Sequence, residues 1–223
     1  MPHMTGAEAI VKSLRLYGVD TIFGLPGGQL DHLFDAMYRE GASLRVIHSR
    51  HEQGVAYMGY GYARSSGRLG VYAVVPGPGL LNSSAALCTA WGNSTPVLCL
   101  SGQIPSTSIG RGYGELHEID DQLGLIRHLT KWARRIEHPA LAPGLVEDAM
   151  RQLRTGRPRP VELEMAMDVM GMEFTDTELL DKKNGDLCDE KEGKVKLFVN
   201  GVESAEVSRQ VIKDGERYEI VFG

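Results

Sequence analysis

The chain has 223 residues, a formal net charge of −5 and 24% charged residues, enough for one large domain or for one domain with a small appendage. It has no basic patch interleaved with aromatic residues, so we expect no nucleic-acid partner. No apolar run approaches the roughly 20 residues that cross a bilayer, and no signal peptide opens the chain. We therefore expect no membrane partner and a cytoplasmic location.

The basic residues change in type along the chain. Through Met170 there are 14 Arg and 2 Lys against 16 acidic residues, and from Gly171 onward there are 2 Arg and 6 Lys against 13 acidic residues. The whole net charge therefore belongs to the tail. This change predicts a main domain over residues 1–170, a charged linker over 171–193 and a small β segment over 194–223.

The first half of the chain alternates apolar strands with helices. Thr5 and Glu8 form a capping-box pattern before an amphipathic helix that Gly18 ends. Strands are predicted at residues 21–25, 44–48, 70–75 and 96–101, and helices at 31–39, from Glu52 onward, and at 80–91. Near-continuous apolar strands in this rhythm predict an α/β fold, a parallel sheet with helices on both faces. Ligands of such sheets bind beyond the carboxyl ends of the strands, where the glycine turns fall.

The second half begins with a long segment that has no periodicity. Residues 103–119 are rich in Gly, Ser and Thr and exceed the length of a plain connector, so the segment is either a functional loop or a flexible one. After it we expect a helix at 120–129, a strand at 131–136, a helix at 142–154 and a strand at 160–168. In this last strand Val161, Leu163 and Met165 alternate and should point inward.

The tail has the pattern of β-hairpins. Val195, Leu197 and Val199 alternate before an Asn-Gly turn at residues 200–201, and an Asp-Gly turn at 214–215 follows. Its ending, KDGERYEIVFG, resembles the closing strands of small β-grasp proteins. Two hairpins bury little surface alone, so we expect the tail to pair with the main domain, a partner or a second copy.

Three cysteines are far apart and form no CxxC pair. Cys88 and Cys99 fall on predicted core elements, which is typical of buried free thiols in a reducing compartment. The histidines and acids near residue 50 form no HExxH pattern, and we expect no metal site in the chain.

Glu52 lies where a predicted strand passes into a helix. A helix N-terminus favours a carboxylate there, and a purely structural role is common for such residues. The surrounding residues 46–67, VIHSRHEQGVAYMGYGYARSSG, resemble the RHEQGAAxxAxGYAxxxGxxGV signature of thiamine diphosphate enzymes, most closely the acetolactate synthase group. In that family this glutamate exchanges a proton with N1′ of the cofactor's aminopyrimidine. The resemblance implies that Glu52 is the catalytic residue.

Two glycine turns are similar to further motifs of the same family. Residues 23–30, FGLPGGQL, resemble its FGxPGG segment, and residues 77–82, GPGLLN, resemble its GPGxxN turn. The resemblance implies that four residues bind the pyrimidine: Pro26, Gly27, Pro78 and Asn82. A dinucleotide-binding turn is the alternative, but Asn82 stands where that motif needs its third glycine.

A third segment extends the resemblance and a fourth departs from it. Residues 91–103 are similar to the family's AxxDSxPxxxxxGQ, with Asn93 in place of the aspartate. At residues 115–118, Glu-Leu-His-Glu stands where acetolactate synthases carry Phe-Gln-Glu. The resemblance implies that Gly28 and His117 are neighbours of the substrate. Alternatively, His117 is simply solvated in its loop.

The chain lacks the family's GDG…N segment, whose oxygen ligands hold Mg²⁺ against the diphosphate. The resemblance therefore implies a pyrimidine-binding (PYR) domain of the thiamine diphosphate-binding fold. A diphosphate-binding partner domain or subunit would hold the Mg²⁺, in a homo- or hetero-oligomer that decarboxylates or ligates a 2-oxo acid. Two alternatives remain open, a catalytically silent binding or assembly module and a nucleotide-binding α/β domain.

Overall fold

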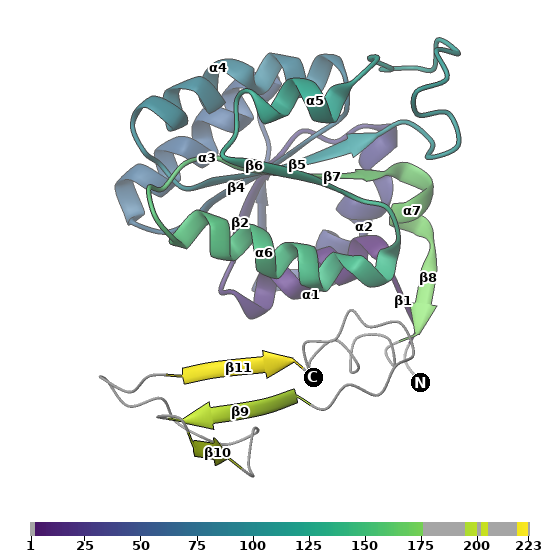
Figure 1. Ribbon diagram of the computed structural model, residues 1–223. Coiled ribbons are helices and arrows are strands. Elements are labelled where there is room, and N and C mark those ends of the chain that lie inside the picture. The colour runs from purple at the N-terminus through teal and green to yellow at the C-terminus, as the bar shows by residue number, and fades with distance from the viewer. Residues whose placement is uncertain (1–2, 176–194, 200–201, 205–217, 223) are drawn as a thin grey trace. The chain divides into compact units, whose positions relative to one another are not determined.

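The computed structural model describes residues 3–175, 195–199, 202–204 and 218–222. The chain divides into two compact units, Met1–Asn184 and Gly185–Gly223. The first unit is built on a six-stranded sheet in the order β3-β2-β4-β5-β7-β6, and all neighbouring strands run parallel (Figure 1). Its strands are β2 (Thr21–Gly24), β3 (Arg45–Ile47), β4 (Gly70–Val74), β5 (Val97–Gln103), β6 (Trp132–Ile136) and β7 (Val161–Ala166).

Helices cover both faces of this sheet (Figure 1). One layer contains α1 (Gly6–Leu16), α2 (Asp31–Arg39), α6 (Ala142–Arg154) and α7 (Met167–Gly171), and the other contains α3 (Glu52–Ser66), α4 (Pro78–Gly92) and α5 (Gln122–Arg127). Short 3-10 turns are η1 (Gly28–Leu30), η2 (Gly41–Ser43) and η3 (Pro139–Leu141). Each layer packs its own apolar core on the sheet. The predicted α/β fold is confirmed.

Local sequence signals account for where several helices begin. At the start of α1 the Thr5 hydroxyl accepts a hydrogen bond from the Glu8 amide at 3.2 Å, and the Glu8 carboxylate accepts one from the Thr5 amide at 2.8 Å. This is the predicted capping box. Helix α4 begins at Pro78, two residues before the predicted start, because proline suits the first helical turn.

Strand β7 differs from its prediction. It lies between β5 and β6, and helices cover both of its faces, so all six of its residues are buried. Glu162 and Glu164 are therefore buried together with the three apolar residues that were expected to face inward. A second correction concerns the cysteines, because Cys99 is buried in β5 as predicted but Cys88 is exposed on α4.

Two short strands were not predicted. β1 (His3–Thr5) and β8 (Glu173–Thr175) pair antiparallel, with His3 opposite Thr175. Each has only three residues, too few to show an alternating pattern. In the part of the chain that the structure describes, no helix has the length and apolar character needed to span a membrane.

The second unit contains an antiparallel sheet in the order β10-β9-β11. Its strands are β9 (Val195–Val199), β10 (Val202–Ser204) and β11 (Tyr218–Phe222). Val199 lies opposite Val202, which is the register of the predicted two-residue hairpin. The strand predicted just before the Asp-Gly turn at residues 214–215 lies outside the described residues.

The strand order reverses beside β2. The chain passes from β2 to β3 on one side and returns to place β4 on the other side of β2. Such a reversal opens a crevice at the carboxyl ends of the two flanking strands, where ligands of open α/β sheets bind. The turns at residues 25–28 and 75–79 follow β2 and β4 at this point, and Glu52 follows β3.

Candidate functional site

Glu52 is the first residue of α3. The preceding His51 caps this helix by accepting a hydrogen bond from the Gln53 amide on its Nδ1 at 3.2 Å. The free N–H groups and the dipole of the helix therefore favour negative charge at the Glu52 carboxylate, which is half-buried. Its Oε2 accepts a hydrogen bond from Asn82 Nδ2 at 3.0 Å. Two predicted site residues, 30 positions apart in the sequence, thus meet across α3 and α4.

The two glycine turns meet at the side chain of Val75. A Cβ atom on Gly27 would lie 2.5 Å from Val75 Cγ1, and one on Gly79 would lie 2.5 Å from Val75 Cγ2. The position of the Gly79 Cβ is also 3.6 Å from Glu52 Oε1. Both turns therefore form one wall that is packed on Val75, where side chains on the two glycines would collide with it, and Gly79 in this wall borders the carboxylate.

The remaining predicted residues of these turns are accessible. Pro26, Gly28 and Pro78 are exposed. A Cβ on Gly28 would have no atom within 4 Å, so this position faces open space. They lie beside Gly27 and Gly79 in the chain.

His117 belongs to the long loop and lies against the second glycine turn. Its φ is +71°, and its carbonyl oxygen would be 2.3 Å from a Cβ on Gly77, whose own φ is +56°. Only glycine fits there. The His117 Nδ1 atom is buried and has no hydrogen-bond partner among the described residues. The hydrogen-bonding capacity of this imidazole nitrogen is therefore not used by any described residue.

Polar contacts hold the loop in a defined shape. The Glu118 carboxylate accepts hydrogen bonds from the amides of Gly112, Gly114 and Glu115 at 3.0, 2.6 and 2.9 Å. Gln29 Nε2 donates to the Leu116 carbonyl at 3.1 Å and so ties the loop to η1. The loop of residues 103–119, which from its sequence is either functional or flexible, thus contacts both glycine turns.

Gln122 is a site residue that the sequence interpretation missed. Its side chain is 1% exposed, and its Oε1 accepts the Gly77 amide at 2.8 Å. Its Nε2 donates to the Gly102 carbonyl at 3.0 Å and to Glu164 Oε2 at 2.8 Å. Gln122 therefore fixes the turn that leads into α4. The sequence pattern that could have predicted the burial of Gln122 is its position one helical turn before Ile126, on the apolar side of α5.

A family comparison covers all of these turns. Residues 4–125 match the family described as thiamine pyrophosphate enzyme, N-terminal TPP binding domain. The chain belongs to this family. Thiamine pyrophosphate, also called thiamine diphosphate, is the cofactor that names the family. The matched residues include Glu52, both glycine turns and His117, so the chain is the pyrimidine-binding part of such an enzyme and its resemblance to the family is confirmed.

Relatives of this thiamine pyrophosphate enzyme domain are similar over about three quarters of the chain. A probable 2-ketoarginine decarboxylase from Pseudomonas aeruginosa is 38% identical over 167 residues, which are 75% of this chain and 30% of that protein. The acetolactate synthase large subunit of Lactococcus lactis is 37% identical over 173 residues, which are 77% of this chain and 29% of that protein. A probable acetolactate synthase large subunit from Methanocaldococcus jannaschii is 41% identical over 171 residues, which are 77% of this chain and 28% of that protein. The chain thus spans less than a third of each relative's length.

The residues present fit the pyrimidine end of thiamine diphosphate. An aminopyrimidine ring is flat and carries a ring nitrogen that can share a proton, so it needs a carboxyl group at its edge. Glu52 supplies this group: Asn82 holds its Oε2 and the backbone of Gly79 lies beside its Oε1. Among the residues that the structure describes, no three His, Cys, Asp or Glu side chains cluster to hold a metal ion.

Two buried glutamates lie behind the glycine turn of this thiamine pyrophosphate enzyme domain. Glu162 accepts a hydrogen bond from Ser101 Oγ at 2.6 Å, while Glu164 is paired with Arg135. Burial, and then repulsion from Glu164, raise the pKa of Glu162 well above its ordinary value of 4.5. Glu162 thus holds a proton more readily than an exposed glutamate would.

Proposed function

We propose that this chain is the pyrimidine half of an acetolactate synthase-type enzyme that decarboxylates or ligates a 2-oxo acid. A diphosphate-binding domain or subunit, supplied by another chain or by further sequence, would hold the diphosphate and Mg²⁺. The observation that carries the proposal is the 3.0 Å hydrogen bond from Asn82 to Glu52, beside the wall of Gly27 and Gly79. The similarity to acetolactate synthase large subunits supports the reaction class.

Glu52 would exchange a proton with N1′ of the pyrimidine. Asn82 donates to Oε2, so Oε1, which lies nearer to Gly79, remains available to the ring. An amide donor on one oxygen also fixes the plane of the carboxyl group, which proton transfer requires. The bound cofactor supplies the electron sink of the reaction.

The other predicted residues would surround the reacting groups. We propose that Pro26, Gly27, Pro78 and Asn82 form the pyrimidine wall and that Gly28 and His117 face the substrate. The buried and unpartnered His117 Nδ1 supports this, because an imidazole can bond to the carboxylate or carbonyl of a 2-oxo acid. The open space at Gly28 supports a substrate on that side.

The same proposal covers the organisation of the protein. Residues 1–170 would be the PYR domain, 171–193 a linker and 194–223 a small β segment, with β8 as the part of the linker that returns to β1. Because the cofactor would lie between this domain and a diphosphate-binding domain, we propose a homo- or hetero-oligomer. We also propose that the protein is located in the cytoplasm.

The proposal can be tested by supplying the missing domains. The Lactococcus lactis acetolactate synthase large subunit without its N-terminal domain would serve as the partner chain. With thiamine diphosphate and Mg²⁺, NMR then measures deuterium exchange at C2 of the cofactor. Glu52→Gln should slow this exchange by roughly 10²-fold or more, because the proton exchanger is lost. Glu137→Gln, at an exposed position, is the control and should leave the rate unchanged.

Two results would contradict the proposal. Equal exchange rates for Glu52→Gln and the unchanged chain, with partner binding retained, would indicate a catalytically silent binding module. Calorimetry provides the second test, because the chain alone should not bind the cofactor tightly without a diphosphate site. Tight binding by the chain alone would show that the diphosphate does not need a second domain, which contradicts the proposal.

A further inference from the structure

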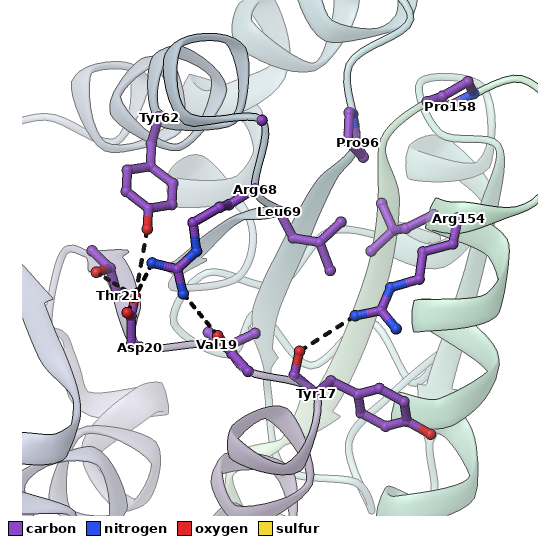
Figure 2. Close-up of a pocket in the computed structure, with 13 residues that line it drawn as sticks. Tyr17, Val19, Asp20, Thr21, Tyr62, Arg68, Leu69, Pro96, Arg154 and Pro158 are labelled. Carbon is purple, nitrogen blue, oxygen red and sulfur yellow. Dashed lines mark hydrogen bonds and ion pairs between the residues drawn. The ribbon is translucent and has the colours of Figure 1, made fainter.

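A separate cavity lies at the edge of the sheet opposite to Glu52. It is formed by the segments that precede β2, β4, β5 and β7 (Figure 2). Its volume is about 400 Å³, which is in the range of about 300–1,000 Å³ found for small-molecule sites. Much of its lining is apolar and consists of Val19, Leu69, Pro96, Leu153 and Pro158.

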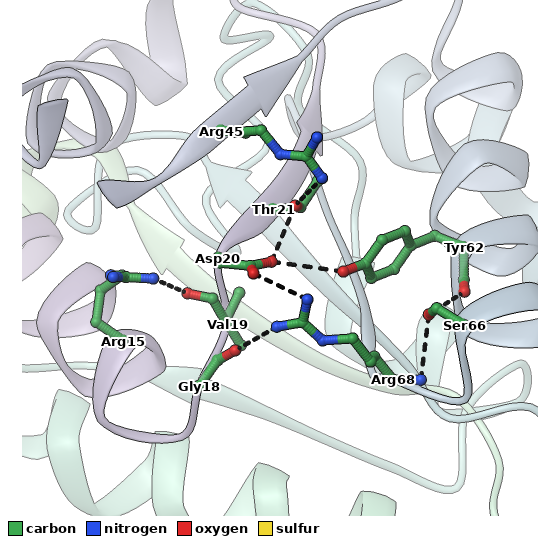
Figure 3. A network of polar contacts seen from close by, with 9 residues as sticks. All are labelled: Arg15, Gly18, Val19, Asp20, Thr21, Arg45, Tyr62, Ser66 and Arg68. Atoms are coloured by element: carbon green, nitrogen blue, oxygen red, sulfur yellow. Dashed lines mark hydrogen bonds and ion pairs between the residues drawn. The ribbon is translucent and has the colours of Figure 1, made fainter. Parts of the chain in front are cut away.

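On one side of the cavity, Arg68 is fully engaged by its neighbours (Figure 3). Its Nη1 is 2.8 Å from Asp20 Oδ2, and its Nη2 donates to the Gly18 carbonyl at 3.0 Å. The hydrogen bond from Arg68 lowers the pKa of Asp20, and burial opposes this effect only in part. Asp20 thus remains ionised at neutral pH and cancels the charge of Arg68.

On the other side, Arg154 has no such counter-charge. Its Nη2 donates to the Tyr17 carbonyl at 3.3 Å, and its guanidinium carbon lies 5.5 Å from the centre of the Tyr17 ring (Figure 2). It forms no ion pair with any residue that the structure describes. The carboxylate of Glu147 raises the pKa of Tyr17, after burial, but it does not pair with Arg154 either.

The cavity therefore combines one uncancelled positive charge with an apolar lining. Among its charged lining residues, Asp20 and Arg68 cancel, which leaves Arg154. The contacts of Arg154 with Tyr17 hold the guanidinium before any ligand arrives, so little side-chain freedom is lost on binding. Because a guanidinium uses one of its edges for Tyr17, the other N–H groups can donate to a carboxylate in parallel.

We propose that this cavity binds a small organic acid, with its carboxylate on Arg154 and its apolar body on Leu69 and Pro96. A phosphate dianion fits less well, because one free positive charge would leave half of its charge uncompensated beside apolar walls. The site is on the opposite edge of the sheet from Glu52 and does not depend on the proposed cofactor chemistry.

An NMR titration of the ¹⁵N-labelled chain tests this proposal. The probes are 4-methylpentanoate, its neutral amide 4-methylpentanamide, and inorganic phosphate. We expect saturable shifts of the Gly18, Val19 and Leu69 amides with the carboxylate, and affinities about tenfold lower for the neutral amide and for phosphate. The comparison of the two organic probes uses the unmodified chain, so it does not depend on the folding of a variant.

Substitutions then identify the charge that matters. Arg154→Gln should weaken 4-methylpentanoate binding by about tenfold. Arg151→Gln is the matched control, because Arg151 lies on the same helix, is paired with Asp148 and does not line the cavity. The proposal is wrong if the carboxylate causes no saturable shifts at these amides, if the neutral amide or phosphate binds as tightly, or if Arg154→Gln binds as well as the control.

Discussion

Replacing Gln122 with methionine should loosen the turn that leads into α4. The two side chains are similar in length and shape, so the change removes hydrogen bonds without opening a large cavity. Four contacts are lost: the bond from the Gly77 amide at 2.8 Å, and those to the Gly102 carbonyl at 3.0 Å, to Glu164 at 2.8 Å and to Ser101 Oγ at 3.4 Å. Because Gln122 is 1% exposed, water cannot replace them without rearrangement.

The size of the effect follows from these contacts. A buried donor or acceptor that loses its partner costs about 1–3 kcal/mol. The Gly77 amide and the Gly102 carbonyl are left without this partner, whereas Glu164 keeps Arg135. We therefore expect the free energy of unfolding to fall by about 2–4 kcal/mol, allowing for partial relaxation of the turn.

Urea denaturation and amide exchange measure this change. Gln122→Met should lower the free energy of unfolding as stated and should accelerate hydrogen exchange at the Gly77 amide. Thr130→Val is the matched control, because Thr130 is also buried and its hydroxyl donates one hydrogen bond, to the Ile126 carbonyl at 2.8 Å. A loss below about 0.5 kcal/mol with unchanged Gly77 exchange would refute the reasoning, since surface substitutions cost as little.

Two further predictions concern the packed wall and the buried acids. Gly79→Ala should destabilise the fold by about 1–3 kcal/mol through its clash with Val75, whereas Gly28→Ala should cost less than about 0.5 kcal/mol, and thermal unfolding compares the two. The folded chain holds a Glu162 proton that the unfolded chain releases, so part of the stability should be lost as pH rises above about 4.5. Glu162→Gln should remove that loss in urea unfolding at several pH values. Glu164→Gln should instead destabilise by about 1–3 kcal/mol, because Arg135 loses its partner. Equal effects of the two glutamine substitutions would contradict the assignment of the proton.

Features that depend on a few adjacent residues could be predicted from the sequence. The capping box of Thr5 and Glu8, the range of α2 and the glycine turns all express local backbone requirements. The fold class followed from the alternation of buried strands with helices. Glu52 was predicted at the start of α3 for the same reason, because an apolar strand and a small-residue helix flank it.

Features that depend on pairing across the fold could not be predicted. The contact between Gln122 and the Gly77 amide joins positions 45 apart, and no local pattern encodes it. The burial of Glu162 and Glu164 follows from the place of β7 between two strands, which only the strand order reveals. Cys88 shows the opposite error, since it falls on a predicted core helix but is exposed.

The short ladder of β1 and β8 places residues 3–5 beside residues 173–175. A folding unit whose entry and exit are neighbours can be spliced into a longer polypeptide without stretching either flank. Recombination could therefore exchange this domain between enzymes as one unit, with the three paired residues on each side holding its two ends together.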